Sequence, residues 1–175
     1  RGADPNYKSV EGSSALIQAT KQGHEKVVQK LIENGANINA GDDSGSTALM
    51  IAADGGNAVL VTKLLESGAN PQSIDATGSN VMIRAVDKGR IPILELLLDS
   101  KIYPDLATTA GITPLMVACT NGNLEIAKTL IDKGAEINSV DRIGSSVLMK
   151  AIDSGKPNLV KLLLDKGASI IHTDK

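Results

Sequence analysis

The chain contains no tryptophan and no phenylalanine, and its only aromatic side chains are Tyr7 and Tyr103 among 175 residues. Aromatic side chains bury large areas and contribute strongly to most protein cores. The core of this protein therefore has to be built from Leu, Ile, Val, Ala and Met. Side chains of this size suit thin layers between short helices, so the composition favours small stacked layers over one large central core.

Cysteine and histidine are almost absent, with Cys119, His24 and His172 as the complete set. A single cysteine forms no internal disulfide, and the sequence has no N-x-S/T glycosylation acceptor, which favours a reducing, intracellular and cytoplasmic setting. The three residues lack the spacing of metal ligands. We therefore expect no metal site, and we expect Cys119 to be a buried packing residue and His24 to cap a helix.

Neither the charge nor the hydropathy indicates a nucleic-acid-binding or membrane protein. Lys and Arg number 18 against 20 Asp and Glu, the net charge is −2, and the pI is near 5.7. Nucleic-acid affinity depends mainly on clustered cations, and this sequence has no basic run. It also has no apolar run long enough to span a membrane and no glycine motif of a nucleotide-binding loop. We expect no nucleic acid, no membrane insertion, no cofactor and no catalysis.

Glycine, in contrast, is abundant and regularly placed. Fifteen of the 17 glycines recur every 33 residues in three series, one of which is Gly12, Gly45, Gly78, Gly111 and Gly144. A fixed period of this length is typical of a solenoid whose units stack on their neighbours. The spacing predicts a single repeat domain over 1–175, with a partial unit at 1–7, full units at 8–40, 41–73, 74–106, 107–139 and 140–172, and a tail at 173–175.

The two ends of the chain lead to a further expectation. The sequence begins with Arg1 inside the end of what resembles an earlier unit, which predicts that the chain is a fragment of a longer protein. Leu163, Leu164, Ile170 and Ile171 make the last unit as apolar as the internal ones. A terminal unit that faces water is expected to be polar on its outer side. We therefore expect further repeats or a capping segment after Lys175.

Each unit contains two apolar segments with helical spacing. The first segment follows directly after Ser14, Thr47, Thr113 and Ser146 in four of the units, and these hydroxyls suit helix N-caps. The second segment has apolar residues at i, i+1, i+4 and i+5, which is one face of a helix. Glycines separate the two segments and end the second one. The sequence therefore predicts two antiparallel helices in each unit and an all-α fold.

These motifs resemble the ankyrin repeat. Residues 42–49 are DDSGSTAL, residues 111–115 are GITPL, and Gly-Ala-x-x-Asn occurs at 35–39 and 134–138. The resemblance covers essentially the whole chain. It implies L-shaped units of two helices and a β-hairpin-like finger, stacked into a curved solenoid whose concave face is lined by the fingers and the first helices.

The chain departs from the family pattern at two kinds of position. The histidine that the family has after Thr-Pro-Leu is replaced by Ile17, Met50, Ile83, Met116 and Met149, so apolar packing has to substitute for its hydrogen bond. In the divergent third unit, Asn80 and Val81 replace Thr-Pro, and Lys101 stands where the other units have glycine. A left-handed backbone at Lys101 would cost about 1–2 kcal/mol.

The resemblance implies a recognition surface, because varied side chains on a constant scaffold can match a partner. We predict the contact residues at the finger tips and at the ends of the first helices: Lys8, Val10, Glu11, Lys21, Gln22, Asp43, Ser44, Asp54, Ala76, Thr77, Asp87, Lys88, Tyr103, Thr109, Ala110, Ile112, Asn121, Arg142, Ile143 and Asp153. Within this set, Ile112 with Ile143, and separately Tyr103, are candidate anchors. Packing between adjacent fingers explains these residues equally well.

We therefore predict a monomeric, non-enzymatic protein-interaction module that binds a protein or peptide on its concave face. Two alternatives remain open from the sequence. The repeats could be the substrate-recruiting or anchoring arm of an enzyme, channel or effector whose active domain lies elsewhere, or they could be a mechanical spacer. The resemblance also implies that Asn39 and Asn138 correspond to positions that asparaginyl hydroxylases modify.

Overall fold

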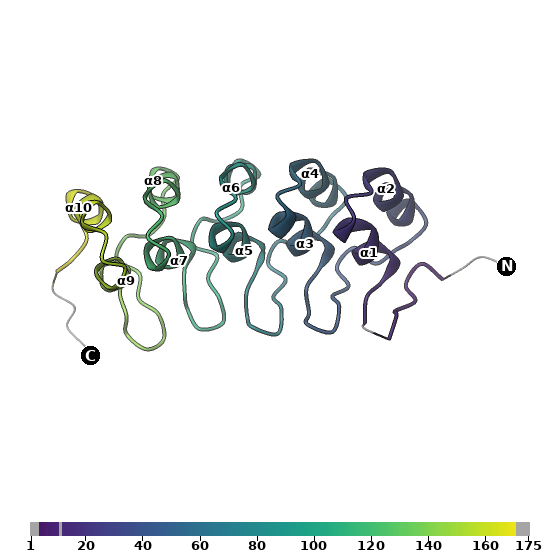
Figure 1. Ribbon diagram of the computed structural model, residues 1–175, viewed down its shortest axis with the longest axis horizontal. Coiled ribbons are helices and arrows are strands. Elements are labelled where there is room, and N and C mark those ends of the chain that lie inside the picture. Colours follow the sequence, from purple (N-terminus) through teal and green to yellow (C-terminus); the bar gives the residue numbers. More distant parts are fainter. Residues whose placement is uncertain (1–3, 11, 171–175) are drawn as a thin grey trace.

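The computed structural model describes residues 4–10 and 12–170, and these residues contain ten α-helices arranged in five pairs. Figure 1 shows the pairs in single file, with the first helices in one row and the second helices in another. The helices are α1 (Ala15–Lys21), α2 (Glu25–Glu33), α3 (Ala48–Gly55), α4 (Ala58–Glu66), α5 (Val81–Asp87), α6 (Ile91–Asp99), α7 (Pro114–Thr120), α8 (Leu124–Asp132), α9 (Val147–Asp153) and α10 (Pro157–Asp165). Residues 1–3, Glu11, Ile171, His172 and the predicted tail at 173–175 lie outside the described residues.

The first helix of each unit begins at a polar side chain that caps it. Ser14, Thr47, Thr113 and Ser146 each accept the backbone N–H three residues later at 3.2–3.4 Å, which confirms the predicted caps. In the third unit, Asn80 takes this role, and its Oδ1 accepts the N–H of Ile83 at 3.1 Å. The Asn80 amide also donates to the carbonyls of Leu106 and Ala107 at 3.0 and 3.2 Å. The departure from the repeat pattern therefore adds a tie between the third and fourth units.

The second helix of each unit buries one apolar face and is followed by left-handed backbone. Leu60, Val61 and Leu64 of α4 are buried, as are the equivalent residues of α6 and α8, which confirms the predicted spacing. In four units a glycine follows with a φ of 84–92°. The third unit has Lys101 there with a φ of 61°, the one non-glycine residue with positive φ among those described. Its Cβ makes this conformation cost about 1–2 kcal/mol.

One apolar core runs along the molecule. The first helices pack in the order α1, α3, α5, α7 and α9, and the second helices also contact their neighbours, so each unit is stabilised by adjacent units. Ile17, Met50, Ile83 and Met116, which stand in place of the family's histidine, are at most 6% exposed. Apolar packing therefore replaces the lost hydrogen bond in these four units. Met149, in the last described pair, is 44% exposed.

The outer face of the last helix pair is apolar, as its sequence indicates. Ile152 is 56% exposed and Leu164 is 40% exposed, whereas Cys119, the residue equivalent to Ile152 one unit earlier, is fully buried. A further repeat or capping segment over this face stays a prediction. No helix among residues 4–10 and 12–170 combines the length and the apolar character that crossing a bilayer requires.

A hairpin loop, here called a finger, precedes each first helix, at 8–14, 41–47, 74–80, 107–113 and 140–146. Figure 1 shows the fingers projecting to one side from the row of first helices. In the third finger, the N–H of Asp75 donates to the carbonyl of Ser79 at 2.9 Å, and Gly78 turns the chain with a φ of 77°. Adjacent fingers are joined by backbone bonds such as Ala76 N to Ser44 O at 2.8 Å. The described residues contain isolated bridges and no strand, so the all-α prediction is confirmed.

Candidate binding surface

Three fingers are organised by an aspartate at their base. Oδ1 of Asp75 accepts the N–H groups of Thr77 at 2.8 Å and Ser79 at 3.0 Å, and Asp42 and Asp141 make the equivalent two bonds in their own fingers. Burial by itself raises the pKa of these carboxyls. The hydrogen bonds outweigh it, so that the pKa of Asp42, Asp75 and Asp141 lies below its ordinary value. The three carboxylates are therefore charged at neutral pH, and a nearby cation stabilises them.

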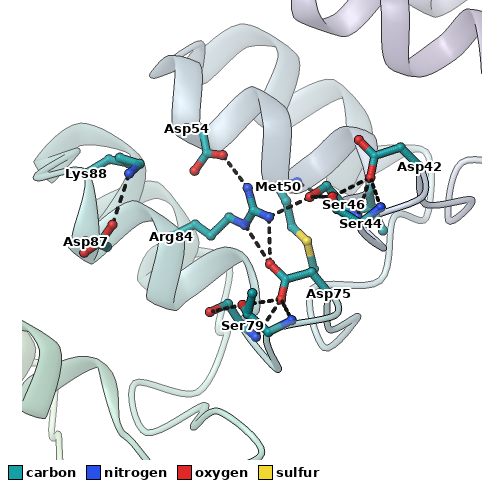
Figure 2. Close-up of polar contacts among 12 residues, drawn as sticks. Asp42, Ser44, Ser46, Met50, Asp54, Asp75, Ser79, Arg84, Asp87 and Lys88 are labelled. Carbon is teal, nitrogen blue, oxygen red and sulfur yellow. Dashed lines mark hydrogen bonds and ion pairs between the residues drawn. The ribbon is translucent and has the colours of Figure 1, made fainter. Parts of the chain in front are cut away.

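Arg84 of α5 is this cation in the third unit, and Figure 2 shows its guanidinium between α3 and the second and third fingers. Nε and Nη2 donate to Asp75 Oδ2 at 3.2 and 2.7 Å, and Nη1 donates to Asp54 Oδ2 at 2.5 Å. Nη2 also donates to Ser46 Oγ at 2.6 Å. The side chain of Asp75 is 3% exposed and that of Arg84 is 22% exposed, so the cluster is largely withdrawn from water.

The charge of Arg84 is secure in this position. Burial lowers the pKa of the guanidinium, but the hydrogen bonds and charges of Asp75 and Asp54 outweigh burial and raise it above its ordinary value. Arg84 therefore connects two fingers to two helices, while Oδ1 of Asp54 is buried with no hydrogen-bond partner among the described residues.

Other units differ in the cation that pairs with the aspartate of the finger. In the fifth unit, Lys150 stands at the helix position equivalent to Arg84 and pairs with Asp141 at 3.1 Å. In the second unit, the cation comes from the preceding unit, because Lys21 lies 3.7 Å from Asp42. The fourth unit has no such pair: Thr108 replaces the aspartate, and its hydroxyl accepts the N–H groups of Ala110 and Ile112 at 3.2 and 3.1 Å.

Arg84 is not among the predicted contact residues, because its helix position holds Gln18, Ile51, Val117 and Lys150 in the other units. A signal was available. An aspartate and a cation are nine residues apart in both Asp75 with Arg84 and Asp141 with Lys150. A pairing across nine residues follows neither a helical nor a strand period, so only the hairpin between the two residues brings them together.

A cavity of about 470 Å³ lies beside Arg84, between the fingers and first helices of the third and fourth units. Six of the predicted contact residues line it: Asp54, Thr77, Asp87, Lys88, Ala110 and Ile112. The other six lining residues are Asp75, Ser79, Ile83, Arg84, Thr108 and Val117. The walls therefore combine carboxylates, cations and hydroxyls with short apolar side chains.

The other predicted contact residues do not line this cavity. Those that are exposed elsewhere are Lys8, Val10, Lys21, Gln22, Asp43, Ser44, Ala76, Tyr103, Thr109, Asn121, Arg142, Ile143 and Asp153. Val10 lines a separate cavity of about 800 Å³ at the first unit, together with Tyr7 and Ser13. Asn121 lies close to the cavity beside Arg84, because its Nδ2 donates to Asp87 Oδ1 at 3.4 Å. Glu11 lies outside the described residues.

The candidate anchors occupy three different environments. Ile112 is half-buried, packs against the core and lines the cavity. Ile143 is 85% exposed, next to the turn glycine of the fifth finger, and does not line the cavity. Ile112 and Ile143 therefore do not form one cavity wall, because one lies at a finger base and the other at a finger tip. Tyr103 is 68% exposed in the loop after α6.

Cys119 and His24 differ in how well the sequence predicted them. Cys119 is buried in α7, and burial raises its pKa to about 12, so the thiol is unreactive at neutral pH and its packing role is confirmed. His24 occupies the N-cap position of α2 but makes no side-chain cap hydrogen bond, so the predicted capping role is wrong. Asn57 and Asn123 do cap the equivalent helices, because a short amide oxygen reaches back to the backbone where the longer imidazole does not.

Within the part of the chain that the structure describes, no group of three or more histidine, cysteine, aspartate or glutamate residues is placed to hold a metal ion. The chemistry on the finger side consists instead of hydrogen bonds and ion pairs among neutral hydroxyls, carboxylates and cations. Such groups suit recognition of a partner's surface.

Comparison with protein families agrees with the repeated helix pairs and fingers. A family model described as "Ankyrin repeats (3 copies)" matches residues 1–75 and 82–174. The chain belongs to the ankyrin repeat family. No curated protein is similar enough to this ankyrin chain to count as a match.

Membership of the ankyrin family explains the regular architecture and narrows the function. Ankyrin repeats are generally protein–protein interaction modules and are typically non-enzymatic. The resemblance seen in the sequence and the solenoid fold are both confirmed. The ankyrin repeat boundaries that the glycine spacing indicates stay a prediction.

Proposed function

We propose that this ankyrin chain is a non-enzymatic interaction module that holds a protein or peptide partner on the surface formed by its fingers and first helices. The observation that carries the proposal is the cavity beside Arg84, where six varied positions selected from the sequence come together. The cavity offers charged, hydroxyl and apolar groups at one place. A partner side chain that enters such a pocket can act as an anchor, because a few buried anchors contribute most of the binding energy.

Rigidity of the cavity supports the same proposal. Arg84 connects Ser46 of the second finger, Asp75 of the third finger and Asp54 of α3. Asn80 holds the third unit to the fourth through the carbonyls of Leu106 and Ala107. A surface that is already ordered loses little conformational entropy on binding. The cavity therefore has the preorganised walls that a binding site needs.

The experiment compares partner capture from a cell lysate by three immobilised proteins. These are the wild type, the triple variant Lys21→Glu, Asp87→Lys and Ile112→Ser, and a matched control with the same kinds of change on the second helices. The control carries Lys128→Glu, Glu95→Lys and Val59→Ser, all at exposed positions. We expect the control to capture the same partner as the wild type and the finger-face variant to lose it.

Ile112 is half-buried, so its replacement by serine can destabilise the fold. Circular dichroism therefore checks that each variant is folded. If the triple variant is unfolded, Lys21→Glu with Asp87→Lys serves in its place. Equal capture by the wild type and a folded finger-face variant would contradict the proposal and favour a role as a spacer or anchoring arm. Loss of the partner in the control alone would indicate that the partner binds the second helices.

A further inference from the structure

The cluster around Arg84 has a counterpart one repeat later, in which the arginine is missing. Asp54, Ser46 and Asp75 hold the guanidinium of Arg84. The residues that follow these by 33 positions are Asp87, Ser79 and Thr108, and Val117 stands in the place of Arg84. The carboxylate of Asp54 and the hydroxyl of Ser46 therefore repeat as Asp87 and Ser79, while the carboxylate of Asp75 and the cation do not repeat.

All four of these counterpart residues line the cavity of about 470 Å³. The supporting hydroxyl contact repeats as well, because Thr77 Oγ1 donates to Ser79 Oγ at 3.2 Å, and the equivalent pair Ser44 and Ser46 lies 2.9 Å apart. Valine is several atoms shorter than arginine. The space that the Arg84 side chain fills in the third unit is therefore open in the fourth.

Asp87 retains the capacity to bind a cation. Its present partners are Lys88 Nζ at 3.2 Å and Asn121 Nδ2 at 3.4 Å. The side chains of Asp87 and Lys88 are 50% and 54% exposed, and exposed ion pairs of this kind contribute little free energy. A cation that enters the cavity can therefore displace Lys88 from Asp87 or share the carboxylate with it.

We propose that the cavity receives the side chain of an arginine from a protein partner, whose guanidinium donates to Asp87 and Ser79 as Arg84 donates to their counterparts Asp54 and Ser46. The inference rests on the proposed function and specifies the chemistry of the partner. The methylene stem of the arginine packs against Ile83, Ile112 and Val117, which form the apolar part of the lining.

The lining favours a guanidinium over other charged groups. A planar guanidinium can donate to a carboxylate and a hydroxyl at once, whereas a lysine ammonium is a point charge on a flexible stem. The carboxylates of Asp54, Asp75 and Asp87 repel an anion in the cavity. The guanidinium of Arg84 does not offset this repulsion, because it is already paired with Asp54 and Asp75. The cavity therefore complements a cation with a forked set of donors.

The first test fills the site from within the chain. Val117→Arg places a guanidinium beside Asp87 and Ser79, and we expect it to abolish binding of an arginine probe. Ile51→Arg is the matched control, because Ile51 is equivalent to Val117 in the second unit and does not line the cavity. We expect this control to bind the probe as the wild type does. Undiminished binding by a folded Val117→Arg variant overturns the proposal.

The probe is acetyl-arginine amide, followed through the methyl NMR signals of Ile83, Ile112 and Val117. Acetyl-citrulline amide has nearly the same shape without the charge, and acetyl-lysine amide has the charge without the planar set of N–H donors. We expect shifts with arginine, weaker ones with lysine and none with citrulline. Asp87→Asn is expected to weaken the arginine affinity about tenfold, while Asp132→Asn at an exposed position of α8 leaves it unchanged. No shift with arginine, or equal shifts with citrulline, overturns the proposal.

A displayed library of random short peptides separates this inference from the proposed function. Peptides that bind the finger side and lose about tenfold in affinity when one arginine becomes citrulline support both. Peptides that bind this side without any arginine overturn the arginine site and leave the proposed function standing. Binding of acetyl-arginine amide with no peptide recovered supports the site and counts against the proposed function.

Discussion

The third and fourth units border the same cavity but organise their fingers by different chemistry. In the third finger, the nearly buried carboxylate of Asp75 accepts two backbone N–H groups, and Arg84 balances its charge. In the fourth finger, the hydroxyl of Thr108 accepts the two equivalent N–H groups, and Val117 stands in place of the arginine. The hairpin bond that closes each finger is nevertheless the same length, 2.9 Å.

This comparison shows that a charge is not needed to form a finger of this shape. A buried ion pair is costly to desolvate, and it contributes little unless every member is hydrogen-bonded. The Arg84 cluster meets this condition in part, because Asp54 and Ser46 of the preceding unit accept from the guanidinium but Oδ1 of Asp54 is buried with no partner among the described residues. The fourth unit avoids the desolvation cost, and the absence of a long side chain at Val117 leaves the cavity open.

The largest expected effect comes from removing the cation of the third unit. Arg84→Met leaves Asp54 and the buried Asp75 without their partner, so we expect the free energy of unfolding to fall by about 3 kcal/mol. Chemical denaturation measures the change. Arg142→Met removes an exposed arginine from the fifth finger and is the control, with an expected change within about 0.5 kcal/mol.

Converting the third unit to the chemistry of the fourth sharpens this test. The double variant Asp75→Thr and Arg84→Val copies Thr108 and Val117, and we expect it to recover most of the stability that Arg84→Met loses. Asp54 is left unpaired but is part-exposed, with 28% of its side chain accessible. A double variant no more stable than Arg84→Met would show that the third finger depends on the ion pair itself.

The helix cap of the third unit should matter more than that of the fourth. Asn80→Ala removes a cap and two bonds to the junction of the third and fourth units, at Leu106 and Ala107. We expect a loss of about 2 kcal/mol in unfolding free energy. Thr113→Ala removes only a cap, and we expect a loss of about 1 kcal/mol. Equal losses in the two variants, measured by denaturation, would show that the inter-unit bonds of Asn80 contribute nothing.

The helix ends of the two units should respond to exchange of lysine and glycine in opposite directions. Lys101 has a φ of 61°, and we expect Lys101→Gly to stabilise the protein by about 1 kcal/mol because glycine adopts this backbone without strain. Gly134→Lys makes the reverse change in the fourth unit, where φ is 88° and a Cβ would meet no atom within 4 Å. A melting-temperature rise in the first variant and a fall in the second is the expected pair of results.

The smallest expected effect concerns Asp105, which stands near the end of the third unit where the first and fourth units have Asn39 and Asn138. Burial raises the pKa of Asp105 above its ordinary 3.8, and the charge of Glu136 adds to this, while the backbone N–H of Glu136 opposes it. As pH rises, the unfolded chain therefore releases this proton first, so folding loses stability between the ordinary and the raised pKa. The cost persists at neutral pH.

Asp105→Asn removes that cost and keeps an oxygen for the N–H of Glu136. We expect a gain of about 0.5 kcal/mol at neutral pH that disappears below the ordinary pKa. Asn138→Asp is the reverse change in the fourth unit, and its expected effect has the opposite sign. Denaturation midpoints at neutral pH and near pH 3 measure both variants. A gain that is equally large at the low pH would exclude the charge of Asp105 as its cause.

Much of the fold could be predicted because its signals are local. The caps Ser14, Thr47, Thr113 and Ser146 lie three residues from the N–H groups that they accept, and the apolar face of α4 repeats within one or two helical turns. The predicted capping role of His24 is wrong. His24 does occupy the N-cap position of α2, but its imidazole makes no cap hydrogen bond. For the candidate site, the sequence analysis predicted Asp87 and Ile112, but Arg84 and Val117 were not predicted.

The sequence by itself determined the helix pairs, their order and the regular stacking, because each depends on residues close together in the chain or on a constant period. Only the tertiary structure decided where the chemistry gathers. Arg84 meets Asp54 from 30 residues away and Ser46 from 38 residues away, so neither contact follows a local pattern. The open cavity at Val117 depends in turn on a side chain that is too short to reach the acceptors of the neighbouring unit. Such a site is set by which side chains meet across adjacent units.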